Sequence, residues 1–148
     1  MKSIYDQIWE SALRKLQVRP LSTFEMEQKL MQKFPKDRGS VLKVIEEMER
    51  VQLLNDRRFT EEFVNYLIQK PIGRMKIMVE SRKRGLDPDL VDQFLVDANW
   101  SEEESAKIAL QEKERVLSEE DPRKRKMKLV NFLRNRGFKD AVIYKITK

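Results

Sequence analysis

A dense group of positive charges near the C-terminal end is the part of this 148-residue sequence best suited to bind another molecule. We name it the 123–128 basic cluster, and it consists of Arg123, Lys124, Arg125, Lys126 and Lys128. Guanidinium and ammonium groups bind phosphates and carboxylates, so the predicted chemistry is anion binding. Asp121-Pro122 predicts that a helix begins just before the cluster. The positive end of a helix dipole disfavours cations there, which favours a binding role.

Three further pairs of cations are weaker candidates. They are Arg57 with Arg58, Arg82 with Arg84, and Arg134 with Arg136. The first pair follows Asp56 at another predicted helix start, as the basic cluster follows Asp121. The other two precede Gly85 and Gly137 at predicted helix ends, where each cation offsets the helix dipole by roughly 0.3–1 kcal/mol. The dipole is a sufficient explanation for these two pairs.

Several kinds of catalysis are excluded by composition. The sequence contains no cysteine and no histidine, so thiolate chemistry, zinc sites and histidine-based acid–base catalysis have no residues to use. The four glycines are not clustered, so no phosphate-cradling loop is present. A two-metal nuclease built from scattered acidic residues is a much less favoured alternative. We therefore predict a protein that is not an enzyme, with no cofactor and no catalytic or metal site.

Charge is distributed unevenly along the chain, whose net charge is +6. Residues 101–121 contain 3 basic and 8 acidic residues, whereas residues 122–148 contain 10 basic residues and 1 acidic residue. Such a basic end attracts a polyanion or an acidic protein surface, although a solvated face that maintains solubility is the alternative. With no apolar leader and no apolar run long enough to span a bilayer, we expect a cytoplasmic monomer without membrane contact.

Apolar residues recur at helical spacing almost throughout, and no alternating run of strand character occurs. Five pairs of residues predict helix starts: Ser22 with Glu25, Asn55-Asp56, Asp87-Pro88, Ser101 with Glu104, and Asp121-Pro122. Pro35, Gly85 and Gly137 predict helix ends. The pattern predicts nine helices, the fifth of which carries Met75, Met78 and Val79 as its apolar residues. The methionine and aromatic stripes are expected in the core.

Part of the sequence occurs twice, 52 residues apart. RMKIMVESRKRGLDPDLVDQF begins at Arg74, and KMKLVNFLRNRGFKDAVIYKI begins at Lys126. A looser match at an offset of 49 pairs Met26 with Met75 and Leu30 with Val79. A fixed period of this size indicates stacked structural units. We therefore predict an all-α, elongated array of three tandem three-helix repeats, at residues 1–54, 55–99 and 100–148.

Four segments, taken in order, resemble one protein family. Leu16 to Ser22, followed by Glu25, Lys29 and Leu30, resembles its first-repeat pattern. Leu54 to Thr60 resembles its leucine-x-Asp-x-x-Phe-Ala motif, with Thr60 in place of the alanine. Residues 73–86 resemble its second-repeat helix, which ends in Gly-Ile, and residues 132–138 resemble its third-repeat ending. The family is the RecX regulatory proteins, which modulate the bacterial recombinase RecA.

The resemblance implies a fold, a partner and an activity. The fold would be a curved row of three three-helix repeats, and the partner would be the RecA–DNA filament, bound within its helical groove across neighbouring protomers. Binding would inhibit strand exchange, ATP hydrolysis and filament growth, within recombination, DNA repair and the SOS response. Single- or double-stranded DNA would be bound weakly and without sequence preference. The second-repeat loop Pro71-Ile72-Gly73 departs from the family pattern, so no contact residue is transferred from it.

Two alternatives belong to other functional classes. Units of three short helices are also compatible with a direct DNA-binding regulator of helix-turn-helix type. No predicted helix carries the Asn, Gln and Arg side chains near its start that base recognition needs, which weighs against this alternative. The second alternative is a helical-repeat scaffold for protein partners. The contrast between acidic residues 101–121 and the basic end favours a partner of mixed polarity over bare DNA.

Overall fold

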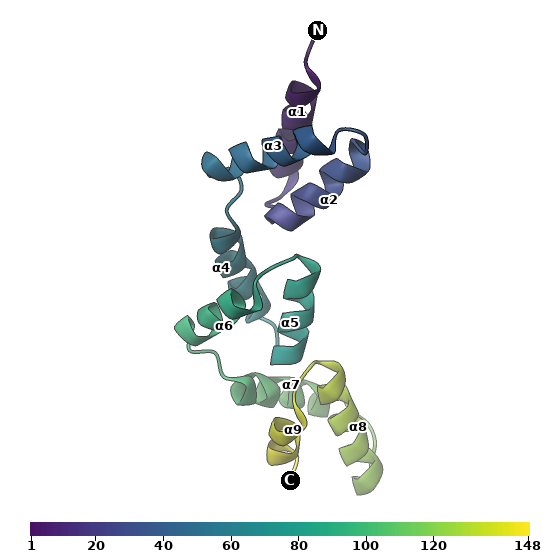
Figure 1. Ribbon diagram of the computed structural model, residues 1–148. Helices are drawn as coiled ribbons and strands as arrows, with labels where there is room; N and C mark the ends of the chain where they lie inside the picture. The colour runs from purple at the N-terminus through teal and green to yellow at the C-terminus, as the bar shows by residue number, and fades with distance from the viewer.

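The computed structural model describes residues 1–148 and is entirely helical, which confirms the predicted fold class. Its nine α-helices follow one another in three groups of three, arranged in an elongated row with the two termini at opposite ends (Figure 1). The helices are α1 (Ile4–Val18), α2 (Thr23–Lys33), α3 (Arg38–Arg50), α4 (Asp56–Leu67), α5 (Arg74–Lys83), α6 (Pro88–Asp97), α7 (Glu102–Val116), α8 (Pro122–Asn135) and α9 (Asp140–Ile146). None of them has the length and apolar character needed to cross a membrane.

Local capping explains where the helices begin and end. The Ser22 hydroxyl accepts a hydrogen bond from the Glu25 N–H, and the Glu25 carboxylate accepts one from the Ser22 N–H, which forms the predicted capping box. Asp121 caps α8 by accepting from the Arg123 N–H, next to Pro122 in the first turn. Gly85 and Gly137 follow α5 and α8 with φ angles of +70° and +87°, a conformation that glycine adopts without strain.

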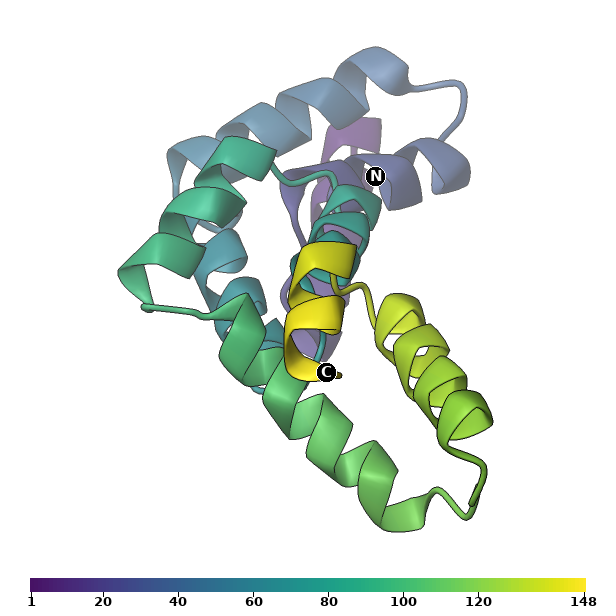
Figure 2. The same cartoon turned by 90° about the horizontal axis from the view of Figure 1, so that it is seen from below.

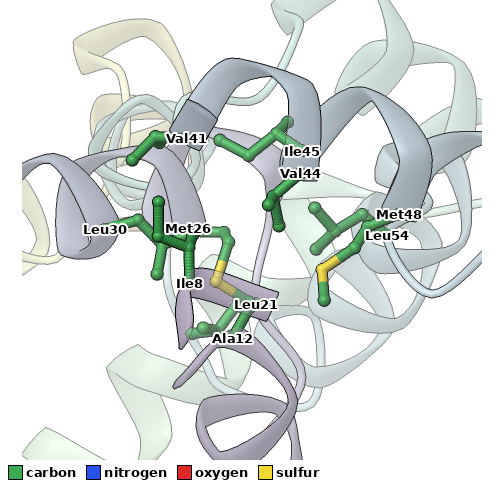
Figure 3. Close-up of a cluster of buried hydrophobic side chains, with 10 residues drawn as sticks. All are labelled: Ile8, Ala12, Leu21, Met26, Leu30, Val41, Val44, Ile45, Met48 and Leu54. Atoms are coloured by element: carbon green, nitrogen blue, oxygen red, sulfur yellow. The ribbon is translucent and has the colours of Figure 1, made fainter. Parts of the chain in front are cut away.

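Each group of three helices encloses its own small apolar core. The first core, drawn in Figure 3, contains Ile8, Ala12, Leu21, Met26, Leu30, Val41, Val44, Ile45, Met48 and Leu54. A second core joins α4, α5 and α6, and a third joins α7, α8 and α9. The most extensive helix packing is likewise within a group, with α1 and α2 on α3, α4 on α6, and α7 on α8 and α9. Because the three cores are separate and lie in one row, the protein exposes a large surface relative to the number of residues that it buries.

The buried face of α5 differs from the predicted one. Ile77 and Ser81 are fully buried and Met78 is partly buried against the second core, whereas Met75 is 65% exposed and Val79 is 40% exposed. Both sides of this helix carry apolar residues and one core position is a serine, so spacing alone selected the wrong face. The offset of 49 between the first two repeats is wrong for the same reason. Buried Met26 and Leu30 correspond to Ile77 and Ser81, which is an offset of 51.

The middle helices of the three repeats are joined end to end (Figures 1 and 2). At the start of α5, the Gly73 N–H donates to the Arg136 carbonyl at 2.7 Å, and the Met75 N–H donates to the Gly137 carbonyl at 3.2 Å. The first N–H groups of a helix and its last carbonyls have no partners within the helix. Here the start of α5 and the end of α8 therefore satisfy each other, which fixes repeat two on repeat three.

The first joint uses side chains for the same purpose. The Ser22 hydroxyl donates to the Arg84 carbonyl at the end of α5 at 2.6 Å, and the Thr23 N–H donates to the Asp56 carboxylate at 2.8 Å. The second joint has the matching bond from the Arg74 N–H to the Glu102 carboxylate, at 2.7 Å. In both joints, the middle helix of one repeat contacts the first helix and the middle helix of the next.

Candidate partner-binding surfaces

The structure divides the 123–128 basic cluster into two groups of side chains. The Arg125 guanidinium donates to the carbonyls of Leu117 and Glu119, at 3.1 and 3.2 Å. Lys128 lies 2.9 Å from the Glu119 carboxylate, and this hydrogen bond holds the pKa of Glu119 below its usual range. Arg125 and Lys128 therefore stabilise the connection between α7 and α8, and their charges are already partnered.

Arg123, Lys124 and Lys126 are exposed and make no ion pair. Arg123 and Lys126 line a shallow groove of about 430 Å³ on α8, together with Arg134 and with Tyr144 of α9. Met127 lies between these cations and is 66% exposed. We name this surface the α8 groove. Its exposed thioether and unpaired cations suit a ligand that is both apolar and acidic.

Arg134 is held in place within the α8 groove. Its guanidinium lies 2.9 Å from the Asp140 carboxylate and donates to the Tyr144 hydroxyl, also at 2.9 Å. The guanidinium is also 5.8 Å from the centre of the Tyr144 ring. Because Asp140 neutralises much of its charge, Arg134 contributes shape and hydrogen bonding to the groove more than net positive charge.

A second groove, on α5, corresponds to the α8 groove by the 52-residue repeat. This α5 groove of about 500 Å³ is lined by Arg74, Met75 and Arg82 of α5, and by Lys139 from the loop before α9. Arg74 corresponds to Lys126, Met75 to Met127, and Arg82 to Arg134. Both helices thus present an exposed methionine between cations, at the same place in consecutive repeats. In the α5 groove the Arg74 guanidinium is bound to Asp92 at 2.7 Å, so Arg82 is its unpaired arginine.

Two of the predicted site residues, Arg84 and Arg136, lie in the joints between repeats. The Arg84 guanidinium bonds the Glu25 carboxylate at 2.9 Å and lies 5.2 Å from the centre of the Phe63 ring. The Arg136 guanidinium covers the Phe132 ring at 4.7 Å. The Arg84 side chain therefore bonds across the first joint, whereas Arg136 takes part in the second joint through its carbonyl, which accepts the Gly73 N–H.

The remaining pair, Arg57 and Arg58, is also engaged within the chain. The Arg57 guanidinium lies 5.3 Å from the centre of the Phe94 ring. Arg58 donates from its side chain to the Gln52 carbonyl at 3.3 Å. Of the predicted residues, Arg82, Arg123, Lys124 and Lys126 are therefore exposed and without an ion pair, whereas the others are held by contacts within the chain.

The acidic start of α7 is partly neutralised by the rest of the protein. The Glu103 carboxylate lies 2.6 Å from the Lys145 ammonium, and this bond lowers the pKa of Glu103. Glu102 accepts the Arg74 N–H in the second joint. The contrast in charge between residues 101–121 and the basic end is therefore used in part to hold repeat three together.

A group of lysines on α1 and α2 was missed by the sequence analysis. Lys15, Lys29 and Lys33 line one groove of about 460 Å³. The spacing of Lys29 and Lys33 places them on one face of α2, but only the packing of α1 on α2 brings Lys15 to them. Across the whole chain, no cluster of three acidic residues is close enough to hold a metal ion.

Three stacked three-helix units define a helical-repeat protein. Residues 55–95 match the family model described as RecX, second three-helix domain. The regulatory protein RecX of Chlorobaculum tepidum is 32% identical over 130 residues, which cover 87% of this chain and 79% of that protein. The regulatory protein RecX of Legionella pneumophila is 32% identical over 144 residues, covering 95% of this chain and 92% of that protein. The chain belongs to the RecX family of regulatory proteins.

Solved structures agree with this assignment at the level of the fold. RecX from Lactobacillus salivarius superposes with a TM-score of 0.77 over 96% of this chain and 93% of its own, at 20% sequence identity. A second regulatory protein RecX superposes with a TM-score of 0.82 over 96% of this chain and 72% of its own, at 18% identity. The three-repeat arrangement is therefore retained where few residues are identical.

Proposed function

We propose that this RecX-family regulator binds the RecA–DNA filament and inhibits strand exchange, ATP hydrolysis and filament growth. The observation that carries this proposal is the repetition of one kind of groove on α5 and α8. A filament presents identical protomers at regular intervals, so a chain with equivalent grooves in consecutive repeats can make the same contact with neighbouring protomers. The elongated shape of the chain suits such a partner.

The proposed mode of inhibition is occupation and needs no chemistry on the partner. Exposed methionines adapt to varied apolar surfaces, and the cations beside them select acidic ones. The proposed contact residues are the free cations of the α8 groove with Lys124, and Arg82 with Arg74 in the α5 groove. Weak, non-specific contact with DNA phosphates accompanies protein binding. In this proposal the chain acts as a monomer on RecA–DNA filaments in the cytoplasm.

Co-sedimentation with RecA assembled on single-stranded DNA tests this function and separates it from direct DNA binding. We expect the chain to sediment with filaments at salt concentrations that release it from bare DNA. Replacing Arg123, Lys124 and Lys126 with Glu should weaken co-sedimentation at least tenfold, which corresponds to about 1.4 kcal/mol. A matched variant carries Glu at the exposed Lys36, Lys43 and Lys148, with the same charge change, and should bind like the wild type. Equal binding to filaments and to bare DNA would refute the proposal.

A further inference from the structure

The groove between α1 and α2 collects three lysines without carboxylates to balance them. Its basic residues are Lys15 of α1, Arg19 at the C-cap of α1, and Lys29 and Lys33 of α2. The apolar side of the groove is formed by Val18 and Leu21. We name it the α1–α2 lysine groove. It lies in the first repeat, whereas the α8 groove lies in the third.

Two lysines of the groove converge on one buried hydroxyl. The Lys15 ammonium lies 3.2 Å from the Ser11 Oγ, and the Lys33 ammonium lies 3.1 Å from the same atom. Ser11 is only 1% exposed, so this oxygen is a fixed point that holds the two lysine side chains. A single neutral acceptor cannot neutralise two ammonium groups, and two like charges held this close together repel each other.

The groove supplies no counterion for its lysines. None of Lys15, Lys29 and Lys33 forms an ion pair with a carboxylate, whereas Lys107, Lys128 and Lys145 each do. Arg19 is already bound to Glu25 at 2.8 Å. Burial lowers the pKa of Lys15, and the charges of Lys33, Lys29 and Arg14 lower it further. Unbalanced positive charge is thus concentrated in a concave site.

We propose that the α1–α2 lysine groove binds a phosphate group. Ammonium groups act as point charges that can approach a tetrahedral phosphate from several directions, and here they come from two helices. A carboxylate is better matched by the planar fork of arginine, but the arginine of this groove is occupied by Glu25. The exposed Gln32 amide offers a further donor at the rim. The inference does not rest on the filament proposal, because it concerns the isolated chain.

The test measures binding of two phosphate sources to the full chain without any partner protein. One source is a fluorescent single-stranded oligothymidylate, followed by anisotropy over a range of salt concentrations. The other is inorganic phosphate, followed as the rise in melting temperature at constant ionic strength. The variants are Lys15→Gln with Lys33→Gln, and Lys29→Gln alone. Lys43→Gln, on the exposed face of α3, is the control with the same loss of charge.

For a site on a nucleic-acid backbone, the double variant should bind oligothymidylate about five- to tenfold more weakly, with a salt dependence shallower by about 0.7 per lysine removed. For a site for free phosphate, oligothymidylate binding should equal that of Lys43→Gln, while the melting-temperature rise with phosphate is lost. In phosphate-free buffer the double variant loses two hydrogen bonds to Ser11 and also the repulsion between two ammonium groups, so its melting temperature should stay close to that of the wild type. The Lys29 side chain makes no internal hydrogen bond, so the Lys29→Gln variant should stay folded. It reports on the same site if the double variant unfolds. Both ligand responses equal to the control would overturn the proposal.

Discussion

The carboxylate of Glu25 in α2 lies 2.9 Å from the guanidinium of Arg84 at the end of α5, across the first joint between repeats. The same carboxylate binds Arg19 at 2.8 Å and accepts the Ser22 N–H at 3.1 Å. Glu25 is buried, so one carboxylate unites the cap of α2, the end of α1 and the neighbouring repeat. The second joint reaches the same geometry with backbone hydrogen bonds between α5 and α8.

Acid should weaken the first joint through Glu25. Burial alone would raise the pKa of Glu25, but the hydrogen bonds from Arg19, Ser22 and Arg84 outweigh burial and lower it. In the unfolded chain the carboxyl has a pKa of about 4.3, so the stabilisation is complete above that pH and is lost as pH falls through the lower folded pKa. The Glu25→Gln substitution should lower the free energy of unfolding by about 1–3 kcal/mol at pH 7. Urea unfolding at several pH values should show the difference from wild type shrinking in acid. A difference independent of pH would contradict this assignment.

Close contact between two glycines should control the second joint. A Cβ atom added at Gly73 would lie 2.2 Å from the Gly137 carbonyl oxygen, and backbone cannot move aside as a side chain can. Gly73→Ala should therefore cost about 1–3 kcal/mol. The control is Gly39→Ala in α3, where nothing lies within 4 Å and a gain of about 0.5–1 kcal/mol is expected. Denaturant unfolding measures both variants. Equal stability of Gly73→Ala and the wild type would show that the joint is loose.

Neighbouring arginines of the 123–128 basic cluster should behave in opposite ways. Arg125→Gln removes a cation that donates hydrogen bonds to backbone carbonyls, so it should lower the free energy of unfolding by about 1–2 kcal/mol. Arg123→Gln changes an exposed side chain and should alter stability by less than about 0.5 kcal/mol. Filament binding should respond in the reverse order, with the larger loss for Arg123→Gln. If both variants changed stability and binding alike, the division of the cluster would be incorrect.

Features set by neighbouring residues could be predicted from the sequence. The capping box of Ser22 and Glu25, the start of α8 after Asp121, and the left-handed Gly85 and Gly137 all depend on groups within a few residues of each other. The segment that occurs twice, 52 residues apart, indicated the repeats because corresponding positions face the same kind of core. The resemblance of several short motifs, taken in order, indicated the family.

Features set by distant contacts could not be predicted in the same way. The buried face of α5 depends on Ser81, a polar residue that spacing does not mark as core. The role of Arg84 depends on Glu25, which lies 59 residues earlier in the chain. Lys15 and Lys33 meet only because α1 packs on α2 around Ser11. Tertiary neighbours therefore decide whether an arginine or lysine stabilises a joint between repeats, stabilises a loop, or remains free on the surface.

ATP hydrolysis by RecA tests the central claim most directly. The chain is added to RecA already assembled on single-stranded DNA, and the hydrolysis rate is followed as the chain is titrated. We predict a progressive fall in the rate that the wild type and the variant with Glu at Lys36, Lys43 and Lys148 share. Glu at Arg123, Lys124 and Lys126 should remove most of the fall while helicity and melting stay nearly unchanged. An unchanged hydrolysis rate with wild-type chain in excess over RecA protomers would contradict the account.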